Sequence, residues 1–262
     1  MSLLEVQHLA KSFGGVRALD GVSFSLDAGR VHALIGPNGA GKTTLFNLIT
    51  GMLAPTSGRI FFRGQEVTGL PPEALAALGI ARTFQNLQVF LDMTVRENVL
   101  VGCHLRLERR LHACLLRTPS LRRAEREARE RADRLLRELG LDRYAEARAD
   151  SLPYGALKRL EIARALAAEP VLLLLDEPAA GCNERETAEI GELLRSVARG
   201  GPTVLLVEHD MRLVMNLAEH ILVLDHGRLL AEGPPERIRR DPQVIEAYLG
   251  RHGQVTDGVA QG

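Results

Sequence analysis

Apolar residues near the N-terminus alternate with polar ones, which is the period of a half-buried strand. The alternating positions are Leu4, Val6, Val22, Phe24 and Leu26. Turn signals at residues 14–15 and 27–29 bound these runs, and residues 59–62 with a turn at 63–65 suggest a further strand pair. We therefore expect an antiparallel β subdomain at the start of the chain.

Four short runs, at residues 31–35, 171–175, 204–207 and 221–224, are apolar almost throughout. Strands covered on both faces have this composition, and helical segments separate the runs, so we predict a mainly parallel sheet with packed helices. Residues 94–144 are helical in period and rich in charge, with Glu127 and Arg131 four apart on one helix face. This stretch predicts a helical subdomain inserted into the sheet domain.

The chain has 262 residues, enough for one large α/β domain or two small ones, and its 33 basic residues balance 33 acidic ones. A neutral chain has no general basic field, which argues against nucleic acid as a partner. No run approaches the ~18 apolar residues of a membrane-spanning helix, and Glu5 and His8 interrupt the N-terminus before a secretory signal forms. The cysteines, Cys103, Cys114 and Cys182, have neither metal nor disulfide spacing. We expect the protein to stay in the cytosol.

The strongest local signal is the loop GPNGAGKTT, which joins the predicted strand 31–35 to a predicted helix. It fills every fixed position of the phosphate-loop pattern. The candidate binding residues are Gly36, Pro37, Asn38, Gly39, Ala40, Gly41, Lys42, Thr43 and Thr44. Backbone N–H groups can surround a β-phosphate, Lys42 can reach the β and γ oxygens, and Thr43 can offer its hydroxyl to Mg²⁺. The loop predicts binding of ATP or a similar nucleotide.

Two adjacent carboxylates, Asp176 and Glu177, follow the apolar run 171–175. Asp176 can hold Mg²⁺ through water, and Glu177, on the other face of the strand, can orient and deprotonate an attacking water. Acidic residues also often cap a buried strand. Combined with a phosphate loop, however, the pair predicts hydrolysis of the nucleotide.

These motifs resemble the nucleotide-binding subunits of ATP-binding cassette (ABC) transporters, up to about residue 250. The resemblance implies three further site residues. Gln85 matches a glutamine that contacts Mg²⁺ or the attacking water in that family, and its amide carries a donor and an acceptor. His209 matches a histidine that donates to the γ-phosphate, although it could also be a capping or surface residue. Phe13 falls where the family places an aromatic ring against adenine, but it could equally belong to the core.

The sequence departs from the family at the signature segment, usually Leu-Ser-Gly-Gly-Gln, which here is LPYGA at residues 152–156. In the family this segment comes from the opposite subunit and closes over the γ-phosphate. Pro153 has neither a hydroxyl nor an N–H group and Ala156 lacks the usual amide, whereas the Gly155 N–H and the helix dipole remain. Asn183 stands where Asp is common. The resemblance implies a complete nucleotide-binding face and a weakened face toward the partner.

Within the family, the chain looks like the ATPases of branched-chain amino-acid importers. Residues 117–123, 177–181, 208–211 and 247–250 carry this likeness, together with a long helical insert. ATPases for urea or amide import and for lipopolysaccharide export share much of the pattern, so the substrate class rests on analogy.

Three other classes of function are open. A stand-alone phosphate-loop kinase or GTPase would not need Gln85, Gly155 or His209, and the sequence has no Asn-Lys-x-Asp guanine motif. A family member acting in DNA repair or on the ribosome would typically carry two cassettes in one chain or a long coiled-coil insert. An ATP-binding regulatory or weakly hydrolysing cassette is favoured by Pro153.

The sequence therefore predicts a peripheral ATPase on the cytoplasmic face of the cell membrane that drives import of a small solute through separate permease subunits. ATP and Mg²⁺ are the expected cofactors. Glu177, His209 and Gln85 are the expected catalytic residues, and Thr43, Gln85 and Asp176 the expected Mg²⁺ ligands. A second ATPase subunit, a paralogue rather than a copy, is the expected dimer partner, and a solute-binding protein is an indirect one.

The predicted fold is α/β: a phosphate-loop ATPase core with a mainly parallel sheet, an N-terminal antiparallel β subdomain and an inserted helical subdomain. Residues 1–92 form the first part of the core with the β subdomain, and residues 93–150 form the helical subdomain. Residues 151–250 carry the signature helix and the rest of the core, and residues 251–262 are a disordered tail.

Overall fold

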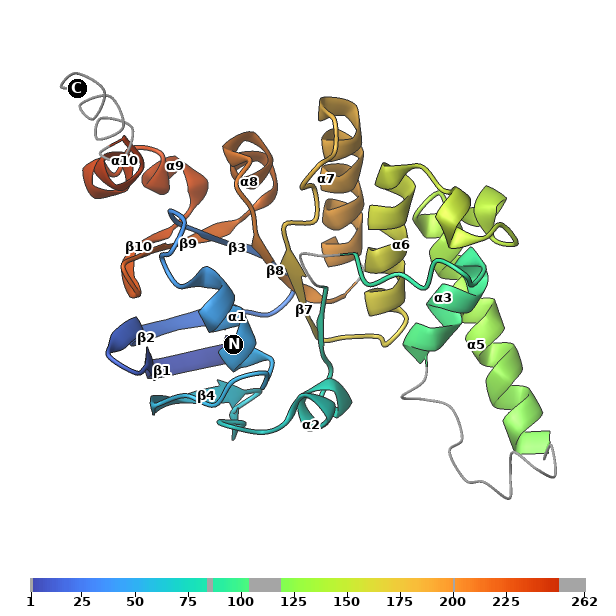
Figure 1. The fold of residues 1–262 in the computed structure, drawn as a ribbon, viewed down its shortest axis with the longest axis horizontal. Helices are drawn as coiled ribbons and strands as arrows, with labels where there is room; N and C mark the ends of the chain where they lie inside the picture. Colours follow the sequence, from blue (N-terminus) through green and yellow to red (C-terminus); the bar gives the residue numbers. More distant parts are fainter. Residues whose placement is uncertain (1, 84–86, 104–118, 200, 250–262) are drawn as a thin grey trace, which may run out of the picture. The chain divides into compact units, whose positions relative to one another are not determined.

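The computed structural model describes residues 2–83, 87–103, 119–199 and 201–249 (Figure 1). It contains two compact units, one of residues 1–75 with 195–262 and one of residues 76–194. The candidate Gln85 and the predicted tail lie outside the described residues. Within the described ranges, none of the helices has the length and apolar content needed to cross a membrane.

An antiparallel sheet with the strand order β2-β1-β4-β5 opens the first unit. Its strands are β1 (Ser2–Phe13), β2 (Val16–Asp27), β4 (Ser57–Phe62) and β5 (Gln65–Glu66). Leu4 pairs with Leu26 on one side and with Phe62 on the other, and all three side chains are buried. Buried residues occupy alternate positions along each strand because successive strand residues point to opposite faces of the sheet. The predicted antiparallel subdomain is confirmed.

A second set of strands in the first unit has the order β10-β9-β3-β8. These are β3 (Val31–Ile35), β8 (Thr203–Val207), β9 (His220–Asp225) and β10 (Arg228–Gly233). β3 pairs in parallel with both β8 and β9, and all five of its residues are buried, which explains its apolar composition. β10, which the sequence analysis did not predict, is antiparallel to β9.

The described part of the first unit also contains four short helices. A further helix, α2 (Pro72–Ala77), spans residue 75, where the first of the unit's two chain segments ends. The four are α1 (Lys42–Ile49), α8 (Met211–Leu217), α9 (Pro235–Ile238) and α10 (Pro242–Leu249). α1 buries Leu45, Phe46, Leu48 and Ile49, the apolar residues whose spacing predicted it.

Helices make up most of the second unit. They are α3 (Val95–Gly102), α5 (Pro119–Glu138), α6 (Tyr154–Leu166) and α7 (Glu184–Arg199). Short 3₁₀ turns, Asp142–Tyr144 and Ala149–Ser151, join α5 to α6, and β6 (Ile80–Arg82) pairs in parallel with the fully buried β7 (Leu172–Asp176). α3, α5 and α6 lie side by side (Figure 1). Gly102 permits this packing, since a Cβ there would lie 2.2 Å from the Arg164 carbonyl oxygen.

The predicted helical insert is thus confirmed at α3 and α5, and Glu127 and Arg131 both lie on α5. Glu127 Oε1 accepts from Arg123 Nε at 2.9 Å, and Arg131 Nη2 reaches Glu169 Oε1 at 2.6 Å. Each of the two residues therefore pairs with another partner: Glu127 with the residue four positions before it, and Arg131 with a residue outside the helix. The boundaries proposed at residues 92, 150 and 250 stay predictions.

Candidate functional site

The phosphate-loop segment leaves β3 at Gly36 and enters α1 at Lys42. Gly36 has φ +153° and Gly41 has φ +102°, backbone conformations that side chains other than glycine rarely adopt. A Cβ at position 36 would lie 2.1 Å from the carbonyl oxygen of Leu224, and one at position 41 would lie 2.7 Å from that of Ala18. Close packing therefore requires glycine at both ends of the loop, and the loop can turn sharply between strand and helix.

Lys42 spans the loop. Its Nζ donates to the carbonyl oxygens of Gly36 at 2.6 Å and Pro37 at 3.0 Å, and the side chain is buried. Thr43 is exposed and Thr44 half-buried in the first turn of α1, where backbone N–H groups lack helical partners. The ammonium group and these N–H groups together form a positive site suited to phosphate oxygens.

The turn between β9 and β10 supports the loop from the outside. The Gly227 N–H donates to the Ala40 carbonyl oxygen at 3.0 Å, and the Gly227 carbonyl oxygen accepts from the Asp20 N–H at 2.8 Å. The side chain of Asp20 is bound by Arg228 at 2.6 Å, and this hydrogen bond lowers its pKa below the ordinary value. Sequence reasoning missed this support, since only a common turn glycine marked it.

The C-terminal helix α10 also reaches the loop. Burial raises the pKa of Tyr248 to about 12, with the backbone of Gly36 acting in the opposite direction as a hydrogen-bond partner. Tyr248, Ile35 and Met215 line an apolar cavity of about 630 Å³ between α8 and the C-terminal helices. The sequence analysis assigned no role to Tyr248.

In the second unit, Asp176 ends β7 as a buried carboxylate. Its Oδ2 accepts from Arg82 Nη2 at 2.9 Å, and both side chains are more than nine-tenths buried. The Asp176 N–H donates to Thr83 Oγ1 at 3.3 Å, and the Thr83 N–H donates to the Leu174 carbonyl oxygen at 2.9 Å. Arg82 is a site residue that the sequence analysis missed, because β6 is too short to produce a clear pattern.

Glu177 follows directly and is half-buried, with a left-handed backbone at φ +51°. Such a conformation costs a non-glycine residue about 1 kcal/mol or more, so the surrounding structure has to impose it. The Glu177 carbonyl oxygen accepts from the Ala180 N–H at 3.1 Å, which closes a turn. The two carboxylates therefore have different environments: Asp176 is buried and paired with Arg82, and Glu177 is half-buried on a strained turn.

Two further candidates, His209 and Phe13, lie in the first unit. β8 runs parallel to β3, so His209, two residues after β8, leaves the same edge of the sheet as the phosphate loop. His209 is exposed, and the cap of α8 is Asp210, whose Oδ1 accepts from Arg212 N at 2.8 Å. Phe13 is 47% exposed at the end of β1, with the Lys11 ammonium 5.1 Å from its ring centre. His209 does not cap α8, but its exposure fits the alternative of a surface residue, whereas Phe13 does not belong to the core.

The segment 152–156 begins α6. Pro153 is the N-cap residue, with φ −58° and ψ 152°, and its carbonyl oxygen accepts from the N–H groups of Ala156 at 3.0 Å and Leu157 at 3.1 Å. Pro153 and Tyr154 are exposed, whereas Gly155 is buried against Glu186. The segment is therefore a helix start whose surface presents a proline where a capping hydroxyl would be usual.

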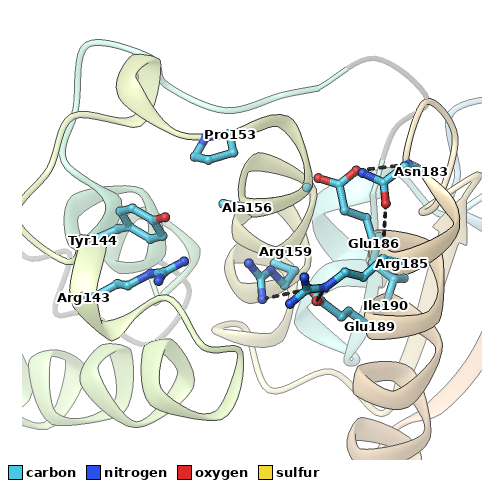
Figure 2. Close-up of a pocket in the computed structure, with 11 residues that line it drawn as sticks. Arg143, Tyr144, Pro153, Ala156, Arg159, Asn183, Arg185, Glu186, Glu189 and Ile190 are labelled. Atoms are coloured by element: carbon cyan, nitrogen blue, oxygen red, sulfur yellow. Dashed lines mark hydrogen bonds and ion pairs between the residues drawn. The ribbon is translucent and has the colours of Figure 1, made fainter.

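A pocket of about 280 Å³ lies beside this helix start (Figure 2). Asn183 and Glu186 cap α7 on one side: Asn183 Oδ1 accepts from the Glu186 N–H, and Glu186 Oε2 accepts from the Asn183 N–H, both at 3.0 Å. Asn183 thus keeps the capping function of an Asp. Glu189 pairs with Arg185 at 3.1 Å, and its other oxygen lies 3.9 Å from Arg159.

Each unit thus supplies one part of the chemistry. The first holds a glycine loop, the Lys42 ammonium and a threonine hydroxyl, which fit a triphosphate. The second holds the Asp176 carboxylate, and carboxylate and hydroxyl oxygens are the hard donors that Mg²⁺ prefers. Taken by itself, each set of residues fits one part of a magnesium–nucleotide complex.

Comparisons with known proteins agree with this chemistry. A family model described as ABC transporter matches residues 19–180, and one described as branched-chain amino acid ATP-binding cassette transporter matches residues 228–253. The chain is 48% identical to the high-affinity branched-chain amino acid transport ATP-binding protein LivG of Escherichia coli. It is 47% identical to the corresponding protein BraF of Pseudomonas aeruginosa. Each match covers 95% of this chain and 98% of the relative.

Solved structures give the same result. The chain is similar to a nucleotide-free ATP-binding cassette from an ABC transporter, with TM-score 0.83 and 36% identity, over 95% of this chain and 99% of the other. A cassette in its ADP conformation matches with TM-score 0.84 and 37% identity over the same shares. A dimeric post-hydrolysis cassette bound to ADP and phosphate matches with TM-score 0.73 and 25% identity, over 88% and 98% of the two chains.

Proposed function

Because the chain belongs to the ATPase family of ABC transporters, we propose that it powers the import of branched-chain amino acids through separate membrane-spanning subunits. The match at residues 228–253 supports this substrate class, since it covers β10, α9 and α10. The similarity to LivG and BraF, which are branched-chain amino acid transport ATP-binding proteins, supports it as well. In this proposal the protein lies at the cytoplasmic face of the membrane, where it binds its permease.

The phosphate loop carries the proposal. The glycines at positions 36 and 41 allow the backbone to approach the phosphates, and Lys42 exchanges its two carbonyl partners for β- and γ-phosphate oxygens. We assign Phe13, exposed at the end of β1, to the adenine ring. Thr43, Asp176 and Gln85 would hold Mg²⁺, which neutralises developing charge on the phosphates when it is bound.

Hydrolysis in this scheme uses Glu177 as general base. Its carboxylate accepts a proton from the water that attacks the γ-phosphorus, while the bond from that phosphorus to the bridging oxygen breaks and ADP leaves. His209 donates a hydrogen bond to the γ-phosphate. The strained backbone at Glu177 supports this role, because strain of this kind clusters at active sites.

Two cassettes would form the working unit, each phosphate loop facing the other chain's signature segment. The dimeric cassette among the similar structures supports this arrangement. Because Pro153 removes a donor, the second cassette in our proposal is a paralogue with an intact signature. The competing reading is an ATP-binding regulatory or weakly hydrolysing cassette, or one serving urea, amide or lipopolysaccharide transport.

The test begins with the complex co-purified from membranes through this chain and reconstituted into vesicles. We expect ATP-driven uptake of leucine, isoleucine and valine and no uptake of urea. Glu177→Gln should lower ATP turnover by on the order of 10²-fold while ATP still binds, and Lys42→Ala should weaken binding itself.

Glu73→Gln is the matched control, since Glu73 is exposed in the first turn of α2. Turnover should be unchanged in this variant. Full turnover by Glu177→Gln would exclude Glu177 as the base, and uptake of urea alone would refute the substrate class.

A further inference from the structure

Tyr154, the first residue of α6, reaches the loop that follows Glu177. Its hydroxyl donates to the Ala180 carbonyl oxygen at 3.1 Å, although the residue as a whole is 43% exposed. An exposed tyrosine that makes a defined hydrogen bond to a loop carbonyl holds two segments together. The two segments here are 26 residues apart in sequence.

The ring of Tyr154 also fixes the next residue of that loop. Gly181 has φ +79°, and a Cβ there would lie 3.1 Å from Tyr154 Cε1 and 3.2 Å from its hydroxyl oxygen. A side chain at position 181 would therefore displace the ring. The Lys158 ammonium also lies 5.9 Å from the ring centre, within the range of a cation–π interaction.

The same loop begins at Glu177. The Ala180 N–H donates to the Glu177 carbonyl oxygen at 3.1 Å and closes a turn. A shift of residue 180 would therefore also move residue 177. Because φ at Glu177 is +51°, its conformation depends on contacts made elsewhere in the loop. Beyond the loop, Glu186 packs against Gly155, so the start of α6 contacts this segment at a second point.

We propose that Tyr154 is a positioning residue that couples the signature segment to Glu177 of the same chain. The inference rests on the proposed function, in which the signature segment contacts the nucleotide of the partner and Glu177 acts on the nucleotide of its own chain. A movement of the start of α6 on dimer closure then shifts Ala180 through the tyrosine hydroxyl. Glu177 is brought into place for its own site when the neighbouring site closes.

Tyr154→Phe tests the coupling, because it keeps the ring against Gly181 and removes only the hydroxyl. In the reconstituted complex we expect kcat to fall about three- to tenfold, the loss of one neutral hydrogen bond, with KM for ATP unchanged. KM should not move because the phosphate loop is untouched. Tyr144→Phe is the matched control, since Tyr144 stacks on Arg143 through its ring, and it should leave kcat unchanged.

The double variant Tyr154→Phe with Glu177→Gln distinguishes coupling to Glu177 from a purely structural role of Tyr154. If Tyr154 acts through Glu177, adding Tyr154→Phe to Glu177→Gln lowers the residual phosphate release no further. Equal losses in both backgrounds, or an unchanged kcat in the single variant, would overturn the inference. If the proposed function itself is wrong, the unsubstituted complex will hydrolyse no ATP, and neither Lys42→Ala nor Glu177→Gln will change its activity. This result differs from a failure of the coupling alone.

Discussion

Asp176 shows at the scale of one residue how a buried carboxylate is paired inside the protein. Burial of an isolated charge is strongly unfavourable, but Arg82 lies 2.9 Å from its Oδ2 and both side chains are buried. Thr83 adds a hydroxyl that accepts from the Asp176 N–H. The arrangement keeps the carboxylate in place for the Mg²⁺ of our proposal, and we expect the stability of the second unit to depend on Arg82.

Removal of Arg82 is therefore expected to destabilise the fold. In Arg82→Ala the carboxylate of Asp176 loses its buried counter-charge, and the free energy of unfolding should fall by about 3–5 kcal/mol. Urea denaturation followed by circular dichroism measures this change.

Arg123→Ala is the control for this measurement, because the exposed pair of Arg123 and Glu127 contributes only about 0.5 kcal/mol. Equal stability of the two variants would mean that the Arg82 pair contributes no more than a surface pair.

At the scale of an element, the start of α6 accommodates the departure from the usual signature sequence at position 153. Pro153 takes φ −58° and ψ 152°, an extended N-cap geometry that serine also adopts. The position is exposed, so a smaller side chain leaves no cavity. Proline is thus compatible with the helix start but provides no side-chain acceptor for the first N–H groups and no hydroxyl for a ligand.

Pro153→Ser should raise the ATP turnover of the isolated chain about tenfold or more, because one donor to a charged phosphate is restored. Stability should change little, since a new cap of about 1 kcal/mol offsets the lost rigidity of proline. Steady-state phosphate release against protein concentration measures the effect.

Pro234→Ser is the matched control, as Pro234 is the N-cap residue of α9 with φ −67° and ψ 157°. Its turnover should equal that of the unsubstituted chain. Fast, cooperative turnover by the unsubstituted chain, with no gain from Pro153→Ser, would show that the departure at position 153 is functionally silent.

At the scale of the whole molecule, the chemistry is divided between two units of one chain and, in our proposal, between two chains. The phosphate loop and His209 belong to the first unit, and Asp176, Glu177 and the signature segment belong to the second. In the proposed dimer, the partner supplies the remaining contacts to the nucleotide. The oligomeric state in the presence of ATP is therefore a direct readout of the proposal.

We expect Glu177→Gln with Mg-ATP to accumulate a dimer with the co-purifying second ATPase subunit, because binding proceeds while hydrolysis is blocked. Alone, the same variant should remain largely monomeric. Light scattering after size-exclusion chromatography gives both masses, and Lys42→Ala should form no dimer in either case. A stable ATP-dependent dimer of this chain alone would contradict the choice of a paralogue as partner.

The features that the sequence predicted are those that depend on local pattern. Alternation predicted β1 and β2, the apolar runs predicted β3, β7, β8 and β9, and helical spacing predicted α1. The loop at residues 36–44 could be recognised from the sequence because its glycines, Lys42 and Thr43 each have a separate chemical role. In contrast, β6 and β10 were missed, since one has three residues and the other carries a mixture of exposed and half-buried positions.

The sequence by itself therefore determined the fold class, and it identified the glycine loop at residues 36–44 and the adjacent carboxylates. Only the tertiary structure decided which groups support them: Arg82 beside Asp176, Gly227 under the loop, Tyr248 from the C-terminal helix and Tyr154 on the turn after Glu177. These contacts join residues distant in the chain, in one case 94 positions apart. No local pattern encodes such a partner, because its identity depends on how strands and helices meet in space.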